Sequence, residues 1–251
     1  MGPDIWNNSA TVQVNFTKDF HMSKYQVTQE LYQAVMGVNP SSFSSNQAEG
    51  EVQGRRPVES VNWYHAIAFC NRLSILEGLT PVYTVSGISN TNADVWLHSA
   101  VPIGSNATWN AVTPNWDANG YRLPTDAQWE YAAKGGDGSP GNFTYSGSND
   151  IDEVAWYSGN SNSRTREVGK KAPNGLGIYD MSGNVWEWCW DRSGPYPGEP
   201  VTDYTGPVSG NNRVVRGGSW YNPAEYSQSV SRYRVYSPLY GDRIGFRVVR
   251  P

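Results

Sequence analysis

Tyrosine and serine are the most frequent residues of 221–243, and these side chains have the chemistry of a ligand-binding surface. The five tyrosines are Tyr221, Tyr226, Tyr233, Tyr236 and Tyr240. Tyrosine mixed with Ser, Gly and Asn is the composition of antibody-type contact loops, where rigid rings supply contact area and small polar side chains supply hydrogen bonds. The alternative is an ordinary surface loop, because loops are commonly rich in Ser, Gly and Asn.

Residue types that often carry catalysis are scarce. Cys70 and Cys189 are too few for a disulfide framework and are wrongly spaced for a zinc site, and the sequence leaves open whether they pair. His21, His65 and His98 lack the spacing of metal ligands or of a catalytic triad. We therefore expect the histidines to be ordinary polar or partly buried side chains.

Composition and charge exclude two classes of partner. The formal net charge of the 251 residues is -4, and no run of Lys and Arg occurs, so we expect no nucleic-acid binding. No apolar run is long enough to cross a bilayer, so we expect no direct membrane insertion by this segment. Met1-Gly2-Pro3-Asp4 lacks the features of a signal peptide, which leaves the compartment open.

Three segments have the start and stop signals of helices. The first runs from about residue 28 to residue 36 and ends at Gly37, and the second begins after Ser60 or Asn62 and ends at Gly78. The third begins with the capping-box pair Thr125 and Gln128 and ends at 135–136, where two glycines follow each other.

Short strands are predicted at 12–16, 214–216 and 246–249, and we expect the first to pair with the last. Residues 221–243 show neither two-residue alternation nor a 3.6-residue apolar stripe, so we predict no regular structure there. No internal repeat or linker divides the chain. The sequence therefore predicts one α+β domain over 1–251, rich in loops, with a variable region at about 221–243.

Several motifs resemble signatures of the formylglycine-generating-enzyme (sulfatase-modifying factor) family. These are Tyr25-Gln26-Val27-Thr28, the segments 57–63, 121–136 and 174–188, Arg216-Gly217-Gly218-Ser219-Trp220 and Ile244-Gly245-Phe246-Arg247-Val248-Val249. They occur in the family's order over roughly 20–250. The resemblance implies a variant of the C-type lectin fold with little regular secondary structure.

The resemblance does not by itself imply catalysis, because one fold hosts several activities. The family's enzymes oxidise a substrate cysteine with two cysteines of their own that hold copper, just after the Gly-Gly-Ser-aromatic motif. Here the corresponding positions are Asn222 and Ser227, and no cysteine follows Cys189. A hydroxyl or an amide cannot replace a thiolate as nucleophile or soft ligand, so we expect no copper and no enzyme activity.

A second branch with this framework comprises variable proteins that a retroelement diversifies at adenine-containing codons. Its scaffold pattern is met here by 217–220, Ala224, Ser229, Arg232, Pro238 and 244–247. The resemblance implies a non-enzymatic, receptor-like protein, exported and displayed on a bacterial surface, monomeric, with a protein or another surface molecule as ligand. The alternative is a lectin-like module of fixed specificity, and a copper oxidase is the third reading.

Two sets of site residues follow from this reading. The expected ligand contacts are Tyr221, Asn222, Pro223, Glu225, Tyr226, Ser227, Tyr233, Tyr236, Ser237, Leu239, Tyr240, Asp242 and Arg243. The resemblance also implies one structural calcium ion at Asp180, Gly183, Val185 and Glu187. Oxygen ligands suit this hard cation, and the alternative is an acidic turn in which Glu187 accepts hydrogen bonds from loop backbone.

Overall fold

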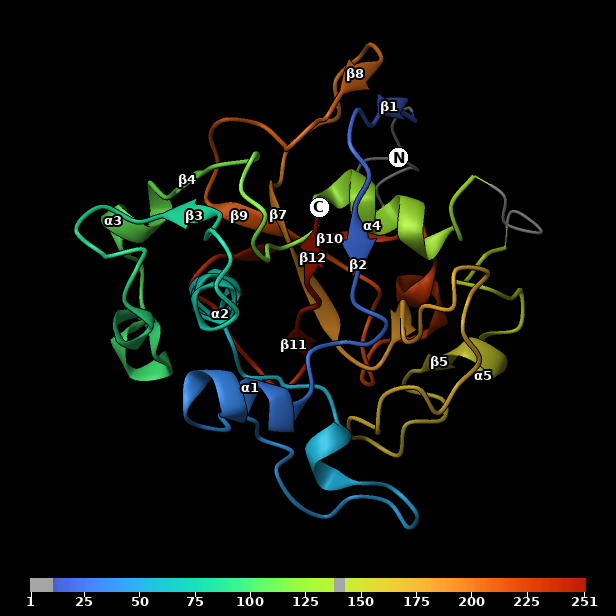
Figure 1. The fold of residues 1–251 in the computed structure, drawn as a ribbon. Helices are drawn as coiled ribbons and strands as arrows, with labels where there is room; N and C mark the ends of the chain where they lie inside the picture. Colours follow the sequence, from blue (N-terminus) through green and yellow to red (C-terminus); the bar gives the residue numbers. More distant parts are fainter. Residues whose placement is uncertain (1–10, 138–142) are drawn as a thin grey trace.

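The computed structural model describes residues 11–137 and 143–251 and shows a mixed α/β fold with many short elements (Figure 1). The helices are α1 (Gln29–Met36), α2 (Trp63–Leu76), α3 (Ala107–Asn110), α4 (Asp126–Ala133) and α5 (Ile151–Val154), with short 3-10 turns η1 (Gln53–Arg55), η2 (Ala93–Trp96), η3 (His98–Ala100) and η4 (Ala224–Ser227). The strands are β1 (Val14–Asn15), β2 (His21–Met22), β3 (Tyr83–Thr84), β4 (Thr113–Pro114), β5 (Ala155–Trp156), β6 (Ser182–Gly183), β7 (Trp186–Arg192), β8 (Val201–Thr202), β9 (Asn212–Arg216), β10 (Arg232–Tyr236), β11 (Ile244–Gly245) and β12 (Val249–Arg250).

The three predicted helices are confirmed as α1, α2 and α4. Thr28 caps α1 by accepting a hydrogen bond from the Leu31 amide, and Gly37 ends the helix with a φ of 85°, a conformation that favours glycine. Both hydrogen bonds of the capping box at Thr125 and Gln128 are present at the start of α4. These caps are local in sequence, which is why the sequence alone predicts them.

A four-stranded sheet in the order β10-β9-β7-β11 forms the centre of the domain. Along β7, the side chains of Trp186, Trp188 and Trp190 point to one face and join the main apolar core with residues of α2. Cys189 points to the other face, where it packs with Trp129 of α4. The sheet is therefore covered by α2 on one side and by α4 on the other.

The predicted pairing of 12–16 with 246–249 was wrong. β1 pairs in parallel with β8, whereas β12 pairs with β2, with Val249 opposite Met22. Val249 also makes a bridge to Arg122 on its other side. Because both edges of β12 are occupied, no edge is left for residues 12–16.

The prediction that 221–243 lacks regular structure was also wrong, because the segment contains η4 and β10. β10 pairs antiparallel with β9 over its whole length. Its apolar face carries only Tyr233 and Val235, and Arg232 on the opposite face is buried. The alternation Arg232-Tyr233-Arg234-Val235 is present but spans only four residues, the shortest run that indicates a strand, and the prediction did not include it.

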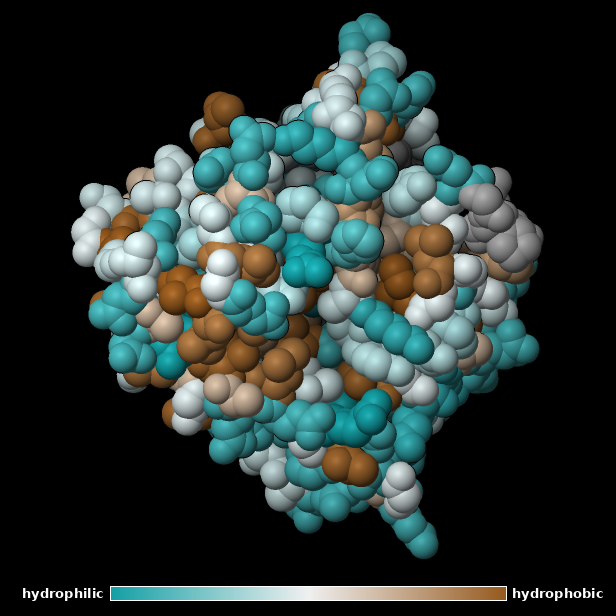
Figure 2. Space-filling view, in the orientation of Figure 1, coloured by the Kyte–Doolittle hydropathy of each residue, from teal (hydrophilic) through white to brown (hydrophobic). Residues whose placement is uncertain are grey.

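Polar residues cover most of the face in Figure 2, and apolar residues gather over the position of α2. Leu76, the last residue of α2, is 54% exposed. Within 11–137 and 143–251, no helix is long and apolar enough to cross a bilayer.

Candidate ligand-binding surface

Residues 221–243 consist of the loop between β9 and β10, strand β10 itself at the edge of the sheet, and the loop that leads to β11. The large exposed side chains are Tyr221 (52%), Tyr236 (37%), Leu239 (55%) and Tyr240 (55%). The segment thus presents four large side chains to solvent within 20 residues, as expected for a contact surface.

A cavity of about 290 Å³ is part of the same surface. Its lining residues are Trp186, Asn222, Tyr226, Tyr233, Val235, Arg243 and Ile244. The ring centroids of Tyr226 and Tyr233 lie 6.3 and 5.6 Å from that of Trp186, so aromatic rings make up much of the wall. The Arg243 guanidinium lies 3.4 Å from the ring centroid of Tyr221 and 3.5 Å from the Asp242 carboxylate, and it places a partly exposed cationic group at the rim.

Hydrogen bonds from outside the segment fix its main chain. The Ser60 and Trp63 amides donate to the carbonyls of Gly241 and Ser237 at 2.9 and 3.1 Å. On the other side, the Ser158 amide donates to Asn222 O and the Ser229 amide to Thr144 O, at 3.1 and 3.0 Å. The backbone is therefore held by neighbours that do not belong to the candidate surface.

Two of the expected ligand contacts, Ser227 and Ser237, are buried, with exposed fractions of 0% and 1%. Their assignment to an exposed surface was wrong. Ser227 packs against Gly218, where a Cβ atom would lie 2.6 Å from Ser227 Oγ, and the Ser237 hydroxyl donates to Asn211 O at 3.2 Å. The Ser237 hydroxyl therefore holds its loop from inside, whereas Ser227 is held through its main chain, because the Ser182 hydroxyl donates to Ser227 O at 2.7 Å.

The other expected contacts remain at least partly accessible. Pro223 and Glu225 are exposed, and Asp242 is half-buried. Asn222 is also half-buried and accepts a hydrogen bond from Trp186 Nε1 at 2.9 Å, so it shapes the cavity wall. Trp186 belongs to the main core and also lines the cavity, and this second role has no signal in the sequence.

A buried ionic cluster attaches β9 and β10 to α4. Arg216 lies 2.5 Å from Asp126 and 2.9 Å from Glu130, and Arg232 lies 2.8 Å from Asp126. Burial favours the neutral form of the Asp126 carboxyl, but Arg216 and Arg232 together lower its pKa below the usual value. Arginines from two strands therefore connect the sheet to α4 beneath the surface, whereas Arg234 is exposed.

The four residues expected at the calcium site lie close together. The carbonyl oxygens of Asp180, Gly183 and Val185 and the carboxylate of Glu187 all face one atom, Nε2 of Gln26. Glu187 is fully buried and forms an ion pair with Arg247 at 2.7 Å. No motif in the sequence connects Gln26 with this site.

The cysteines are both free and buried. Burial raises the pKa of both thiols above the usual range. The histidines are not all isolated, since the rings of His65 and His98 stack at 4.1 Å and His65 Nδ1 accepts from the Asn62 amide in the cap of α2. Burial followed by the charge of His98 lowers the pKa of His65 to about 3, which keeps its ring neutral.

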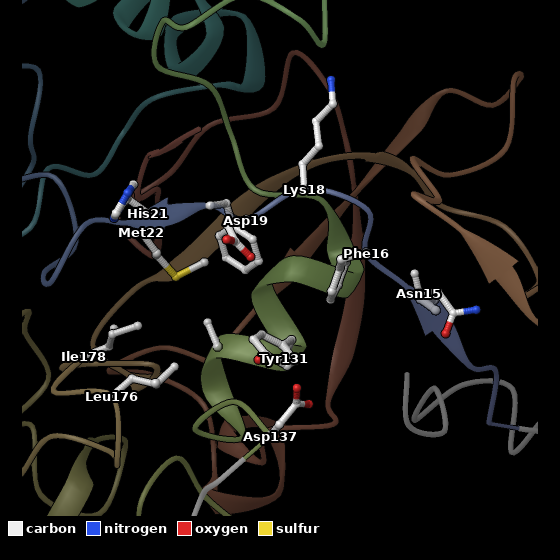
Figure 3. A pocket seen from close by; sticks show the side chains of 13 residues that line it. Asn15, Phe16, Lys18, Asp19, His21, Met22, Tyr131, Asp137, Leu176 and Ile178 are labelled. Carbon is white, nitrogen blue, oxygen red and sulfur yellow. The ribbon is translucent and has the colours of Figure 1, made fainter.

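A larger cavity of about 680 Å³ lies beside α4 and contains none of the expected contact residues. Figure 3 shows Phe16 and Tyr131 on its wall, with Lys18, Asp19 and Asp137 around them. The ring centroids of Phe16 and Tyr131 are 5.5 Å apart in an edge-to-face arrangement. Because its polar residues form no catalytic arrangement, we assign no chemistry to this cavity.

Solved structures of other proteins have the same fold as this chain. The solved structure of Treponema denticola variable protein 1 superimposes with a TM-score of 0.88 and 43% identity, over 98% of this chain and 88% of that one. PvdO from Pseudomonas aeruginosa has a TM-score of 0.65 and 25% identity, over 94% of this chain and 82% of that one. The expected C-type lectin-like fold of the formylglycine-generating type is thus confirmed.

Similar sequences carry different functional names. A chaperone protein, LppX, of Paenibacillus barcinonensis is 41% identical over 92% of this chain and 80% of its own length. A formylglycine-generating enzyme of Streptomyces coelicolor is 35% identical over 51% of this chain and only 44% of the enzyme. The model of the family described as "Sulfatase-modifying factor enzyme 1-like domain" matches residues 1–251. The chain belongs to this family.

Proposed function

We propose that this chain is a non-enzymatic ligand-binding protein whose contact surface is formed by exposed side chains of 221–243. The proposal rests on one observation: the residues that hold the main chain of 221–243 in place are different from the residues whose side chains are exposed on it. Main-chain groups are fixed by donors such as Ser60, Trp63 and Ser158, while Tyr221 and Tyr240 remain about half exposed. Side chains at such positions can change without refolding, because surface substitutions usually alter stability by less than about 0.5 kcal/mol.

The ligand is proposed to be a protein or another molecule displayed on a cell surface. The aromatic cavity under Tyr226 and Tyr233 has room for an apolar side chain, and Arg243 at its rim is positioned to meet an acidic group. The chain would act as an exported monomer displayed on a bacterial surface. The similarity to a Treponema variable protein supports this reading, and it further supports diversification of 221–243 by a retroelement.

A lectin-like or chaperone-like module of fixed specificity is the second candidate, and the 41% identity to a protein named as a chaperone favours it. Sequencing the codons for 216–251 across a natural population separates the two. For a diversified surface, we expect substitutions at exposed positions such as Tyr221, Tyr236 and Tyr240, traceable to adenines in a nearby template copy. Buried Ser237 and Arg232 should stay constant. Uniform codons at the exposed positions would leave only the module of fixed specificity.

A copper oxidase would need accessible thiols that bind copper, whereas the proposed function predicts none. Because Cys70 and Cys189 are buried, on different core clusters, and have raised pKa values, we expect no thiol-dependent tight Cu(I) binding in the native protein. A chromogenic thiol reagent should likewise react with neither cysteine until denaturant is added, and then with both. A stoichiometric Cu(I) site that is lost in Cys189→Ser would instead support an oxidase.

A further inference from the structure

The candidate calcium position is filled by the side-chain amide of Gln26. Its Nε2 atom lies 3.0 Å from Val185 O, 3.0 Å from Glu187 Oε1, 3.2 Å from Asp180 O and 3.4 Å from Gly183 O. The amide has two N–H donors, and its shortest contacts are those to Val185 O and Glu187 Oε1, at hydrogen-bond length from nitrogen. Calcium takes six to eight oxygens at the shorter distance of about 2.3–2.6 Å. The positive end of the amide dipole thus stands where four oxygens converge.

The Glu187 carboxylate has no acceptor capacity left for a metal ion. Oε1 accepts from Gln26 Nε2 and from Arg247 Nη2 at 2.8 Å, and Oε2 accepts from Arg247 Nε at 2.7 Å and from Trp129 Nε1 at 2.6 Å. Two donors on each oxygen satisfy the four lone-pair positions of a carboxylate. Its charge is balanced by Arg247, and both side chains are 0% exposed.

We propose that the Gln26 amide replaces the structural calcium ion implied by the family, so that a direct hydrogen-bonded link performs the ion's task. Gln26 joins the segment before α1 to the turn of 180–187. Next to it, the Val27 amide donates to Phe246 O at 2.9 Å, and Arg247 reaches Ser23 O and Tyr179 O at 3.0 and 2.8 Å. These hydrogen bonds hold the segment before α1, the turn of 180–187 and residues 246–247 together without a metal.

The orientation of the amide distinguishes this arrangement from a calcium site. Among the described residues, Gln26 Oε1 accepts no hydrogen bond. If the amide were reversed, Oε1 would face four oxygens, an arrangement that only a cation between them would stabilise. Calcium binding with Gln26 as an additional ligand is therefore the rival outcome that the experiment must separate.

The first measurement is the melting temperature of the unaltered chain in calcium chloride and in EDTA, with bound calcium measured by elemental analysis. We expect the same Tm in both buffers and less than stoichiometric calcium. A Tm that falls in EDTA and recovers on adding calcium, with about one ion bound per chain, would overturn the proposal. This measurement needs no variant and is therefore independent of any folding defect.

The second measurement uses Gln26→Glu, which puts a second carboxylate among the four oxygens. We expect its Tm in EDTA to fall by roughly 10 °C, because a buried anion lacks a partner, and calcium to restore much of the loss. Gln13→Glu, the same change at an exposed residue, should be insensitive to calcium. A loss in Gln26→Glu that calcium does not relieve would show that Gln26 does not occupy a cation position.

Discussion

Replacing Arg216 with Met should lower the free energy of unfolding by about 3–5 kcal/mol, because the change leaves buried carboxylates without their main counter-charge. Arg216 is 0% exposed and contacts both Asp126 and Glu130. It also donates to the carbonyls of Val230 and Ser231, immediately before β10. Methionine fills a similar volume, so the loss reports mainly on charge and hydrogen bonding.

Denaturant unfolding of Arg216→Met beside Arg234→Met measures this effect. Arg234 lies on the same face of β10 as Arg232 but is exposed, so its replacement should change the unfolding free energy by no more than about 0.5 kcal/mol. Equal small losses in both variants would mean that Arg232 and Lys134 alone can balance the carboxylates of α4. Arg216→Met should also make the loop before β10 more susceptible to proteolysis, because the carbonyls of Val230 and Ser231 lose their donor.

Helices could be predicted because their signals lie within a few residues of each other. Asn62 caps α2 by accepting from the amide of His65, three residues later, and the pair Thr125 and Gln128 does the same for α4. The sheet has no such local signal. β11, for example, is two residues long and pairs in parallel with β7, some 58 residues earlier in the chain, so its partner depends on the whole fold.

The site could be predicted only in part. The composition of 221–243 identifies the surface, and Tyr221, Tyr236 and Tyr240 are exposed there. Composition cannot show that Ser227 and Ser237 turn inward, because a serine serves equally well as an exposed contact or as a buried hydrogen-bond donor. The contacts of Gln26 could not be predicted from the sequence, because the oxygens around its amide belong to residues 154 to 161 positions later in the chain.

Replacing Trp220 with Ala should cost about 3–5 kcal/mol, the range for truncation of a core aromatic residue. Trp220 is 6% exposed, and its ring packs edge-to-face on Phe43 at a centroid distance of 5.1 Å. Its indole nitrogen donates to Asp242 O at 2.8 Å, and its own carbonyl accepts from the Ser161 hydroxyl at 2.8 Å. For a chain of this length the loss corresponds to a fall in Tm of roughly 6–20 °C.

Thermal unfolding of Trp220→Ala, Trp220→Phe and Tyr240→Ala separates packing from hydrogen bonding. Trp220→Phe retains much of the ring but loses the bond to Asp242 O, so its cost should be smaller, about 1–3 kcal/mol for an unsatisfied buried acceptor. Tyr240 is 55% exposed, and its truncation should change stability by less than about 0.5 kcal/mol.

The comparison also tests how the scaffold supports the proposed contact surface. Trp220 lies before the first exposed tyrosine, yet its side chain holds the main chain of Asp242 at the far end of the segment. If Trp220→Ala melts close to the unaltered chain, the bond from the Trp186 amide to Arg243 O must suffice to hold that end. A large loss means that one buried ring fixes both ends of 221–243, which allows the exposed side chains between them to vary while the backbone stays in place.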